Sequence, residues 1–255
     1  ILAGALFVLS TYASTEIWVR GDFAELTAMM LMPLQMGALL WWRRSRTCLS
    51  LAALSLATVA LLISHAPVAF VTLLLIGVYI CIEDLLIGRS LRNALLSGLP
   101  ILCGVLLAAF YWFPIVLEWN LVQPELAFAG LYGYSRHFID LGELAGPAGA
   151  GHALVPVALG LPMLLSLALL AVFAFAYRQN SSQQQRELVR LLLCLTLGST
   201  FLLLRVSEPL WQVIPLLPKI QFPWRILTLL TLGLSGLGAV WVLGTGKLKS
   251  IAVGL

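Results

Sequence analysis

The sequence predicts an all-α membrane protein, a polytopic bundle of transmembrane helices in one domain that covers residues 1–255. Of its 255 residues 61% are apolar and only 10% are charged, whereas about a quarter of the residues in a soluble domain carry charge. The charges are spaced between apolar runs of roughly 20 residues, which is long enough to cross a hydrocarbon core of about 30 Å. This composition excludes a large soluble catalytic domain and a disulfide-rich scaffold, and we expect no nucleic acid among the partners.

Eight apolar runs are predicted to form the spans, and each is bounded by charged or turn-forming residues. The first run is too short to cross a membrane, so we expect it to be the outer half of a helix whose beginning is missing. The sequence turns apolar again at its end, so we expect an internal piece of a longer protein. The predicted spans are 1–13, 23–42, 48–64, 67–87, 93–117, 153–177, 188–205 and 223–245.

The boundaries of these spans can be justified in chain order. The second span begins after the polar connection 14–25 and ends at a run of arginines, and the tight turn 64–67 joins the third span to the fourth. The fifth span ends at Glu118, and the loop 118–152 that follows is predicted to be extracytoplasmic. A polar stretch rich in Gln and Arg separates the sixth span from the seventh, and the eighth opens at Pro223.

The distribution of basic residues predicts the orientation of the bundle. If the first span runs outward, ten of the fifteen basic residues fall in cytoplasmic connections, while eight of the eleven acidic residues fall on the outer side. Basic residues are enriched in cytoplasmic loops, so we expect the C-terminal end of the chain to be cytoplasmic. The basic residues on that side are Arg43, Arg44, Arg46, Arg89, Arg92, Arg178, Arg186, Arg190, Lys247 and Lys249.

The first polar cluster on the predicted outer side is the connection 14–25, which holds Glu16, Arg20, Asp22 and Glu25. Carboxylates close to a guanidinium can hold a hydroxyl group, act as a base or position a metal ion. For Asp22 and Glu25 there is a structural alternative, because their spacing also fits a capping box at the start of the next helix. Capping does not account for Glu16 and Arg20.

The second cluster follows the aromatic run 110–113, which is typical of an interfacial belt. Its long loop is of a length that is usually functional or disordered. Residues 135–145 are predicted to form a short surface helix with Phe138 and Leu141 facing the membrane. The polar and aromatic residues of the loop are Tyr132, Tyr134, Arg136, His137, Asp140 and Glu143.

The third cluster, 207–225, ends in the sequence Gln-Phe-Pro-Trp-Arg that opens the last span. Pro223 in the first turn, the free backbone amides and Arg225 together predict a phosphate or carboxylate site at a helix N-terminus. The alternative is that Trp224 and Arg225 anchor the helix at the lipid headgroups.

Two further observations limit the function. His65, His137 and His152 all fall on the predicted outer side, but their spacing fits no zinc signature. The middle of every predicted span lacks Asp, Glu, Lys and Arg, whereas ion-coupled transporters usually keep such residues there. Any chemistry is therefore expected at the outer membrane surface.

Taken together, these segments resemble a known family. The motifs are Tyr12 with Trp18-Val-Arg-Gly-Asp-Phe-Ala-Glu25, Ser64-His65-Ala-Pro, Trp112-Phe-Pro with Glu118, and Gln221-Phe-Pro-Trp-Arg225. Over most of its length the chain is similar to the bacterial membrane proteins named 6-pyruvoyl-tetrahydropterin synthase-related, which resemble the GT-C superfamily of polytopic glycosyltransferases. The pterin name carries no weight here, because the chain lacks the zinc–histidine spacing of a soluble pterin synthase.

The resemblance implies a GT-C-like fold in the bacterial inner membrane, with a sugar transferred from a polyprenyl-phosphate donor on the extracytoplasmic face. Its partners would be membrane lipid and the polyprenyl-phosphate-linked sugar; a divalent metal ion is a candidate cofactor, although no residue is assigned as its ligand. GT-C enzymes carry their catalytic carboxylate in the first long outer loop, so the general base is expected upstream of Ile1. The site-lining candidates are Glu16, Arg20, Asp22, Glu25, His65 and Glu118, and the phosphate-binding candidates are Gln221 and Arg225.

The alternative is a non-catalytic polytopic membrane protein, either a transporter or a scaffold for envelope assembly. A transferase needs the outer polar clusters to bind a phosphate and a sugar, whereas a scaffold does not. The lack of charge within the spans counts against an ion-coupled transporter but leaves the scaffold open.

Overall fold

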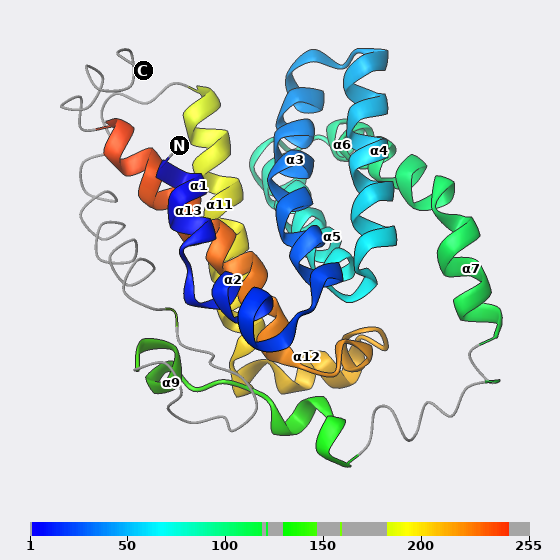
Figure 1. Cartoon of the computed structure of the whole chain (residues 1–255). Coiled ribbons are helices and arrows are strands. Elements are labelled where there is room, and N and C mark those ends of the chain that lie inside the picture. The colour runs from blue at the N-terminus through cyan, green and yellow to red at the C-terminus, as the bar shows by residue number, and fades with distance from the viewer. Residues whose placement is uncertain (1, 119–120, 122–129, 147–158, 160–182, 245–255) are drawn as a thin grey trace.

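The computed structural model is helical throughout the residues that it describes, which are 2–118, 121, 130–146, 159 and 183–244 (Figure 1). Within these ranges there is no strand, so the predicted all-α class is confirmed for the described part of the chain. The predicted span 153–177 lies outside it.

The long helices are α3 (Phe23–Ser45), α4 (Cys48–Ser64), α5 (Ala66–Ile80), α6 (Leu91–Leu107), α11 (Gln183–Leu203) and α13 (Leu227–Gly244). The short helices are α1 (Leu2–Val8), α2 (Thr11–Thr15), α7 (Ala109–Leu117), α9 (Leu141–Ala145) and α12 (Glu208–Val213), with π-helical turns at η1 (Glu16–Arg20) and η2 (Cys81–Ile87). Single 3-10 turns form η4 (Gly130–Tyr132), η5 (Tyr134–Arg136), η6 (Arg205–Ser207), η7 (Leu217–Ile220) and η8 (Pro223–Ile226).

Three helical segments are long and apolar enough to cross a membrane by length and composition, namely Phe23–Ser45, Ala66–Ile87 and Pro223–Val240. The bounds of α4 are those of the predicted span 48–64, but its 17 residues are fewer than the roughly 20 that a full crossing needs. Three bent pairs of helices would raise the number of spans in the described residues to six. The expected eight spans are therefore confirmed only in part.

The bent pairs correct the predicted spans 1–13 and 93–117, which are not single straight helices, whereas α11 covers nearly all of the predicted span 188–205 and the third bend lies at its end. The chain turns by 47° between α1 and α2, by 65° between α6 and α7, and by 86° between α11 and α12. At the first bend the hydroxyl of Ser10 accepts a hydrogen bond from the Ala13 amide at 3.2 Å and so starts a new helix.

The other two bends have local causes as well. The Trp112 indole N–H donates to the Val105 carbonyl at 2.8 Å, which satisfies a carbonyl freed where α6 gives way to α7. Leu204 interrupts the helical backbone after α11 because its conformation is extended (φ −85°, ψ 145°).

Helix ends are fixed by side chains that the sequence places there. Asp22 caps α3 by accepting from the Glu25 amide at 3.0 Å, and Arg46 ends the helix in the left-handed conformation with φ 50°. Thr47 and Ser50 form a reciprocal capping box that starts α4. His65 Nδ1 accepts from the Val68 amide at 3.3 Å and so caps α5.

Glycines let neighbouring helices approach closely. A Cβ atom on Gly104 of α6 would lie 2.6 Å from the Ser55 carbonyl oxygen of α4. A Cβ on Gly233 of α13 would lie 2.4 Å from the Thr196 hydroxyl of α11. Small residues at helix crossings are typical of membrane bundles, where close packing replaces the hydrophobic effect as the main force between helices.

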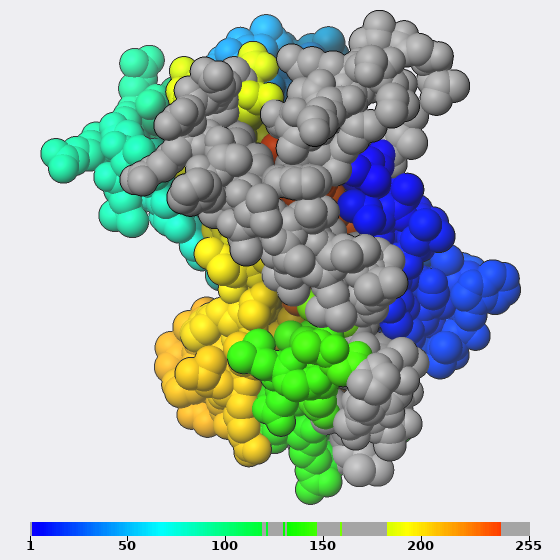
Figure 2. All heavy atoms as spheres, turned by 90° about the vertical axis from the view of Figure 1, so that its left-hand side faces the viewer, coloured from blue at the N-terminus to red at the C-terminus, as the bar shows by residue number. Residues whose placement is uncertain are grey.

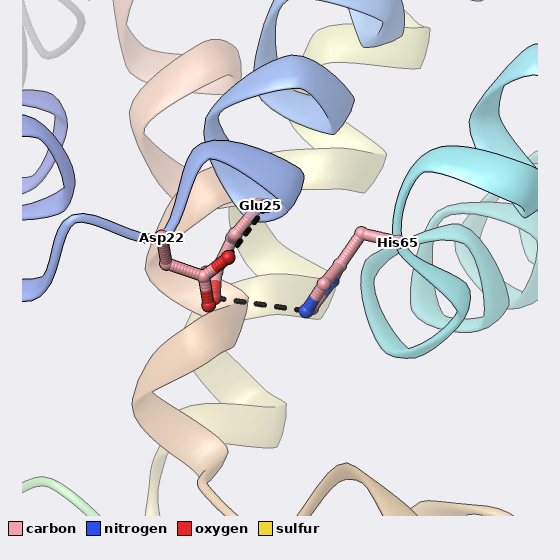
Figure 3. Close-up of side chains that lie close together, drawn as sticks. All are labelled: Asp22, Glu25 and His65. Atoms are coloured by element: carbon pink, nitrogen blue, oxygen red, sulfur yellow. Dashed lines mark hydrogen bonds and ion pairs between the residues drawn. The ribbon is translucent and has the colours of Figure 1, made fainter.

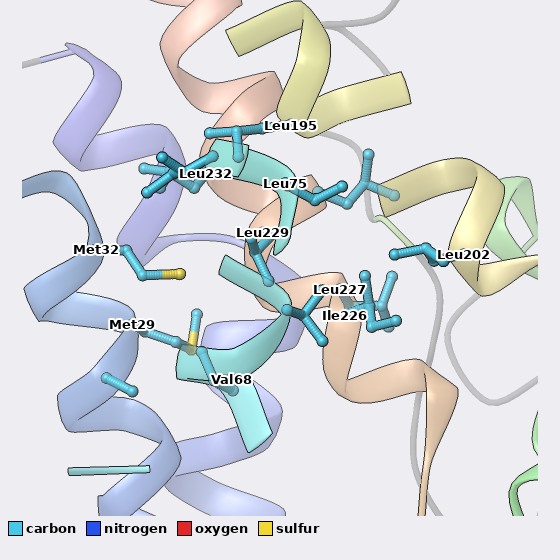
Figure 4. Close-up of a cluster of buried hydrophobic side chains, with 14 of the residues drawn as sticks. Met29, Met32, Val68, Leu75, Leu195, Leu202, Ile226, Leu227, Leu229 and Leu232 are labelled. Atoms are coloured by element: carbon cyan, nitrogen blue, oxygen red, sulfur yellow. The ribbon is translucent and has the colours of Figure 1, made fainter. Parts of the chain in front are cut away.

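The apolar core lies where α3, α5, α11 and α13 meet (Figure 4). Met29 and Met32 of α3 are fully buried there, facing the side chains from α5 and α13. The core residues labelled in the figure are Met29, Met32, Val68, Leu75, Leu195, Leu202, Ile226, Leu227, Leu229 and Leu232. This core fixes the mutual positions of the three helices whose ends carry the polar site described below.

The described part of the loop that is predicted to be extracytoplasmic, residues 130–146, packs against the end of α11 and the segment that follows it (Figure 2). The Ile139 amide donates to the Leu203 carbonyl at 3.0 Å, and Phe138 packs edge-on against Trp211 with ring centroids 5.5 Å apart. The predicted surface helix is therefore wrong in two respects. The helix is confined to α9, and Phe138 is buried in the protein instead of facing the membrane. Leu141 is exposed, which agrees with the prediction for that residue.

Candidate functional site

A buried carboxylate, Glu25, lies at the centre of a polar cluster at one end of the bundle. Its Oε1 accepts hydrogen bonds from the Tyr12 hydroxyl at 2.6 Å and from the Thr228 hydroxyl at 3.2 Å. Its Oε2 accepts from Arg20 Nη1 at 2.8 Å. These donors come from α2, α13 and η1. The Glu25 side chain, in the first turn of α3, therefore connects three other segments through hydrogen bonds.

Arg20 is the second centre of the cluster. Its guanidinium pairs with Glu16 one turn earlier in the chain, with Asp22 Oδ2 at 3.1 Å and with Glu25. Its Cζ also lies 4.5 Å from the centre of the Trp224 ring, within cation–π range. The π-helical turn η1 and the left-handed Gly21 (φ 63°) that ends it place Arg20 between the three acids.

Two further side chains reach Glu25 from distant parts of the sequence. His65 Nε2 lies 4.0 Å from Glu25 Oε2 (Figure 3), and Arg225 Nε lies 3.5 Å from the same oxygen. Arg225 also donates from Nη1 to the Ile220 carbonyl at 3.0 Å. Burial lowers the pKa of the His65 imidazole, and the nearby Arg225 and Arg20 charges act in the same direction, against Glu25 and Asp22.

The net charge of the cluster depends on Glu16. With His65 neutral and all three acids ionised, three carboxylates face the two guanidinium groups of Arg20 and Arg225, which leaves one excess negative charge. Burial and the nearby Glu25 charge raise the pKa of Glu16 to about 7, so protonation of Glu16 near neutral pH removes that excess. Two buried atoms, Glu16 Oε2 and Arg225 Nε, have no hydrogen-bond partner. Buried polar groups are normally satisfied, so these two atoms are the places where the cluster can accept or donate a further hydrogen bond.

The structure brings together six of the residues proposed from the sequence, which are Glu16, Arg20, Asp22, Glu25, His65 and Arg225. The capping alternative holds for Asp22, which caps α3. It does not account for the Glu25 carboxylate, whose oxygens bind Tyr12, Thr228 and Arg20. The anchoring alternative does not fit Trp224, because that side chain is buried within the protein at 4% exposure.

Two of the proposed residues, Glu118 and Gln221, are not among the described residues that form a hydrogen bond or ion pair with Glu25. Glu118 is exposed at the end of α7, which stands apart from the Glu25 cluster in Figure 1. The cause is the bend between α6 and α7, which carries the end of the predicted span away from the bundle. Gln221 lies between η7 and η8 with a positive φ of 66°, close in sequence to Arg225.

Sequence reasoning missed the part that Tyr12 and Thr228 play as ligands of Glu25. A weak signal existed for each. Tyr12 lies four residues before Glu16, and Thr228 lies three residues after Arg225, so each shares a helical face with a residue already singled out. A Tyr near a membrane surface is nevertheless more typical of an interfacial belt.

The nearest approach to a metal site is formed by Asp22, Glu25 and His65, whose ligand atoms lie within 4.8 Å of one another. These residues do not fit a divalent cation. Arg20 already pairs with both carboxylates, and a metal ion would have to displace its guanidinium. His65 uses Nδ1 to accept from Val68, so the neutral ring carries its proton on Nε2, the atom that would have to bind the metal.

No family model, curated protein or solved structure matches this chain. The resemblance to the bacterial membrane family therefore depends on the short sequence motifs alone.

Proposed function

We propose that the chain is a GT-C-like glycosyltransferase of the bacterial inner membrane, and that the Glu25 cluster binds the phosphate end of a polyprenyl-phosphate-linked sugar on the extracytoplasmic face. The observation that carries this proposal is the convergence of Arg20, Arg225 and His65 on three carboxylates at one end of the bundle. Arginine is the residue best suited to phosphate, because its planar N–H groups match phosphate oxygens.

In this proposal the arginines stabilise the leaving group. The bond between the sugar C1 and the phosphate oxygen breaks, and a bond between C1 and an acceptor hydroxyl oxygen forms. The hydroxyl proton passes to a carboxylate base, and the polyprenyl phosphate leaves with the bonding electron pair. Arg225 is the candidate for the phosphate contact because its buried Nε has no hydrogen-bond partner. The resemblance assigns this base to none of the residues of the Glu25 cluster.

The side chains packed around the Arg225 guanidinium are apolar and come from α5, from the segment that leads into α13 and from α13 itself. They are Pro67, Val68, Val71, Ile220, Ile226 and Leu229. This apolar packing strengthens the electrostatic interactions of Arg225, because little water reaches its guanidinium.

The test compares Arg225→Ala with the matched control Arg205→Ala. Arg205 is 73% exposed and pairs only with the neighbouring Glu208 at 3.5 Å. In a strain that lacks the gene, each variant is expressed from a plasmid, its membrane level is measured, and lipid-linked sugars are analysed by mass spectrometry. We expect Arg225→Ala to reduce transfer by at least about 100-fold, as loss of a transition-state donor does, while Arg205→Ala restores it. Full transfer by a normally expressed Arg225→Ala protein would remove Arg225 from the site.

A scaffold is the second candidate, and one observation favours it. Each carboxylate of the cluster already has a partner within the chain, so the cluster can also serve to hold α2, α3 and α13 together. A scaffold predicts that deletion of the gene leaves lipid-linked sugars unchanged and that envelope assembly fails through loss of a partner. The same mass-spectrometric experiment distinguishes the two functions.

A further inference from the structure

A second buried polar cluster lies at the opposite end of the bundle, where α3 ends and α6 begins (Figure 1). Arg43 Nη1 and Nη2 donate to the two oxygens of Asp84 at 2.7 and 3.0 Å, a bidentate pair. Arg43 Nη1 also donates to the Ser97 hydroxyl at 2.9 Å. The Arg43 and Asp84 side chains are only 10% and 6% exposed, so the acid and the base of this pair neutralise each other.

Arg46 joins this cluster without an acid of its own. Its Nη2 donates to the Ser97 hydroxyl at 3.2 Å, and its Cζ lies 4.9 Å from the centre of the Trp42 ring. The other ion pairs described at this end bind Glu83 to Arg190 and Glu187 to Arg44. No carboxylate among the described residues therefore pairs with Arg46.

The cluster has more donors than acceptors. Two arginines share the single hydroxyl oxygen of Ser97, and the buried atoms Arg43 Nε and Arg46 Nη1 have no hydrogen-bond partner. Burial and the neighbouring Arg43 charge lower the pKa of the Arg46 guanidinium, against the weaker effect of Asp84. A partly buried cation beside a second cation is unfavourable unless an anion lies close to both.

We propose that Arg43, Arg46 and Ser97 bind the phosphate group of an anionic phospholipid. A phosphodiester offers negatively charged oxygens to the N–H groups that have no acceptor, and it balances the one excess positive charge. Arg89 and Arg92 are exposed at the same end of the bundle and add to the attraction for anionic lipid.

Exposed apolar side chains at the same end of the bundle favour a lipid over a free anion. Leu49 in the first turn of α4 is 68% exposed, and Leu91 in the first turn of α6 is 65% exposed. A membrane phospholipid brings its acyl chains to such side chains, whereas inorganic phosphate has nothing to place there. The site is separate from the Glu25 cluster, so the proposal does not depend on the glycosyltransferase function.

The test uses the purified full-length protein in a neutral detergent. Binding is measured by native mass spectrometry and by the rise in Tm on adding phosphatidylglycerol, phosphatidylcholine or inorganic phosphate. The variants are Arg46→Gln and the control Arg205→Gln at the other end of the bundle. We expect phosphatidylglycerol to bind the wild type and Arg205→Gln equally, and Arg46→Gln about tenfold more weakly, as loss of one charge-assisted hydrogen bond predicts.

Three outcomes would overturn the proposal. Equal binding of phosphatidylglycerol to the wild type and to Arg46→Gln would remove Arg46 from the site. Equal binding of phosphatidylcholine would show that negative charge is not recognised, and an equal rise in Tm with inorganic phosphate alone would show a free-anion site. If Arg46→Gln does not fold, Arg46→Lys keeps the charge but loses the planar donors, and a phosphate site predicts weaker binding for it too.

Discussion

Glu25→Gln should destabilise the protein because it removes the buried charge at the centre of the polar cluster. The substitution keeps the shape of the side chain, and the new amide oxygen can still accept from Tyr12 and Thr228. It removes the charge that faces Arg20 Nη1 at 2.8 Å and Arg225 Nε at 3.5 Å. The Glu25 side chain is fully buried, so water cannot replace the lost charge.

The magnitude follows from burial and from the remaining partners. Removing one member of a buried ion pair costs about 3–5 kcal/mol, because the other charge is left without compensation. Arg225 loses its only carboxylate partner among the described residues, whereas Arg20 keeps its pairs with Glu16 and Asp22, so the lower end of the range applies. A loss of about 3 kcal/mol lowers the ratio of folded to unfolded protein roughly 100-fold.

The assay is equilibrium unfolding of the purified protein in detergent micelles, with Asp22→Asn as the matched control. Asp22 is 25% exposed, and Asn caps helices as well as Asp does. The control therefore loses only a partly exposed ion pair, worth less than about 1 kcal/mol. If Glu25→Gln is within about 1 kcal/mol of the wild type, the charge of Glu25 does not hold the cluster together, and the reasoning above fails.

Two further predictions concern packing and pH. Gly104→Ala should lower the free energy of unfolding by about 1–3 kcal/mol in the same assay, because its Cβ would lie 2.6 Å from the Ser55 carbonyl oxygen. The control Gly98→Ala lies on the same helix with no atom within 4 Å of its Cβ, so it should not lower the stability. Equal free energies of unfolding for the two variants would contradict the close contact of α4 and α6. The lowered pKa of His65 means that the folded state favours the neutral ring, so its contribution to stability is present above the ordinary pKa of about 6.5 and is lost as pH falls below that value. Tm measured from pH 7.5 to 5 should therefore fall less steeply in His65→Asn, which can still cap α5, and an unchanged slope would exclude His65 as a cause.

The sequence was sufficient to predict which polar segments share one side of the bundle. The residues 14–25, His65 and Arg225 each adjoin a predicted span on the outer side, and a membrane topology alone brings such segments to the same side. It could not show which of them touch. That depends on α3, α5 and α13 being neighbours around the core, and the contact between Glu25 and Thr228 joins residues 203 positions apart.

Two further differences between the expectations and the structure have physical causes. Glu118 was proposed as a site-lining residue from the resemblance, and it follows the predicted span 93–117. The 65° bend at Ala108 carries it away, and the hydrogen bond from Trp112 to Val105 that supports this bend gives no hydropathy signal. Phe138 was assigned to the membrane because apolar residues on a short helix favour it, but Trp211 provides a protein surface for the ring instead.

The polar clusters at the two ends of the bundle differ in their net charge. Around Glu25 three carboxylates face two arginines, whereas Arg43 and Arg46 share Asp84 and Ser97 and leave an excess positive charge. Between the two ends, the helices are held by apolar side chains and by close contacts at Gly104 and Gly233. The end with the excess positive charge is the end predicted to be cytoplasmic, where anionic lipid headgroups lie, so the arginines that predict the orientation include those that we propose to bind such headgroups.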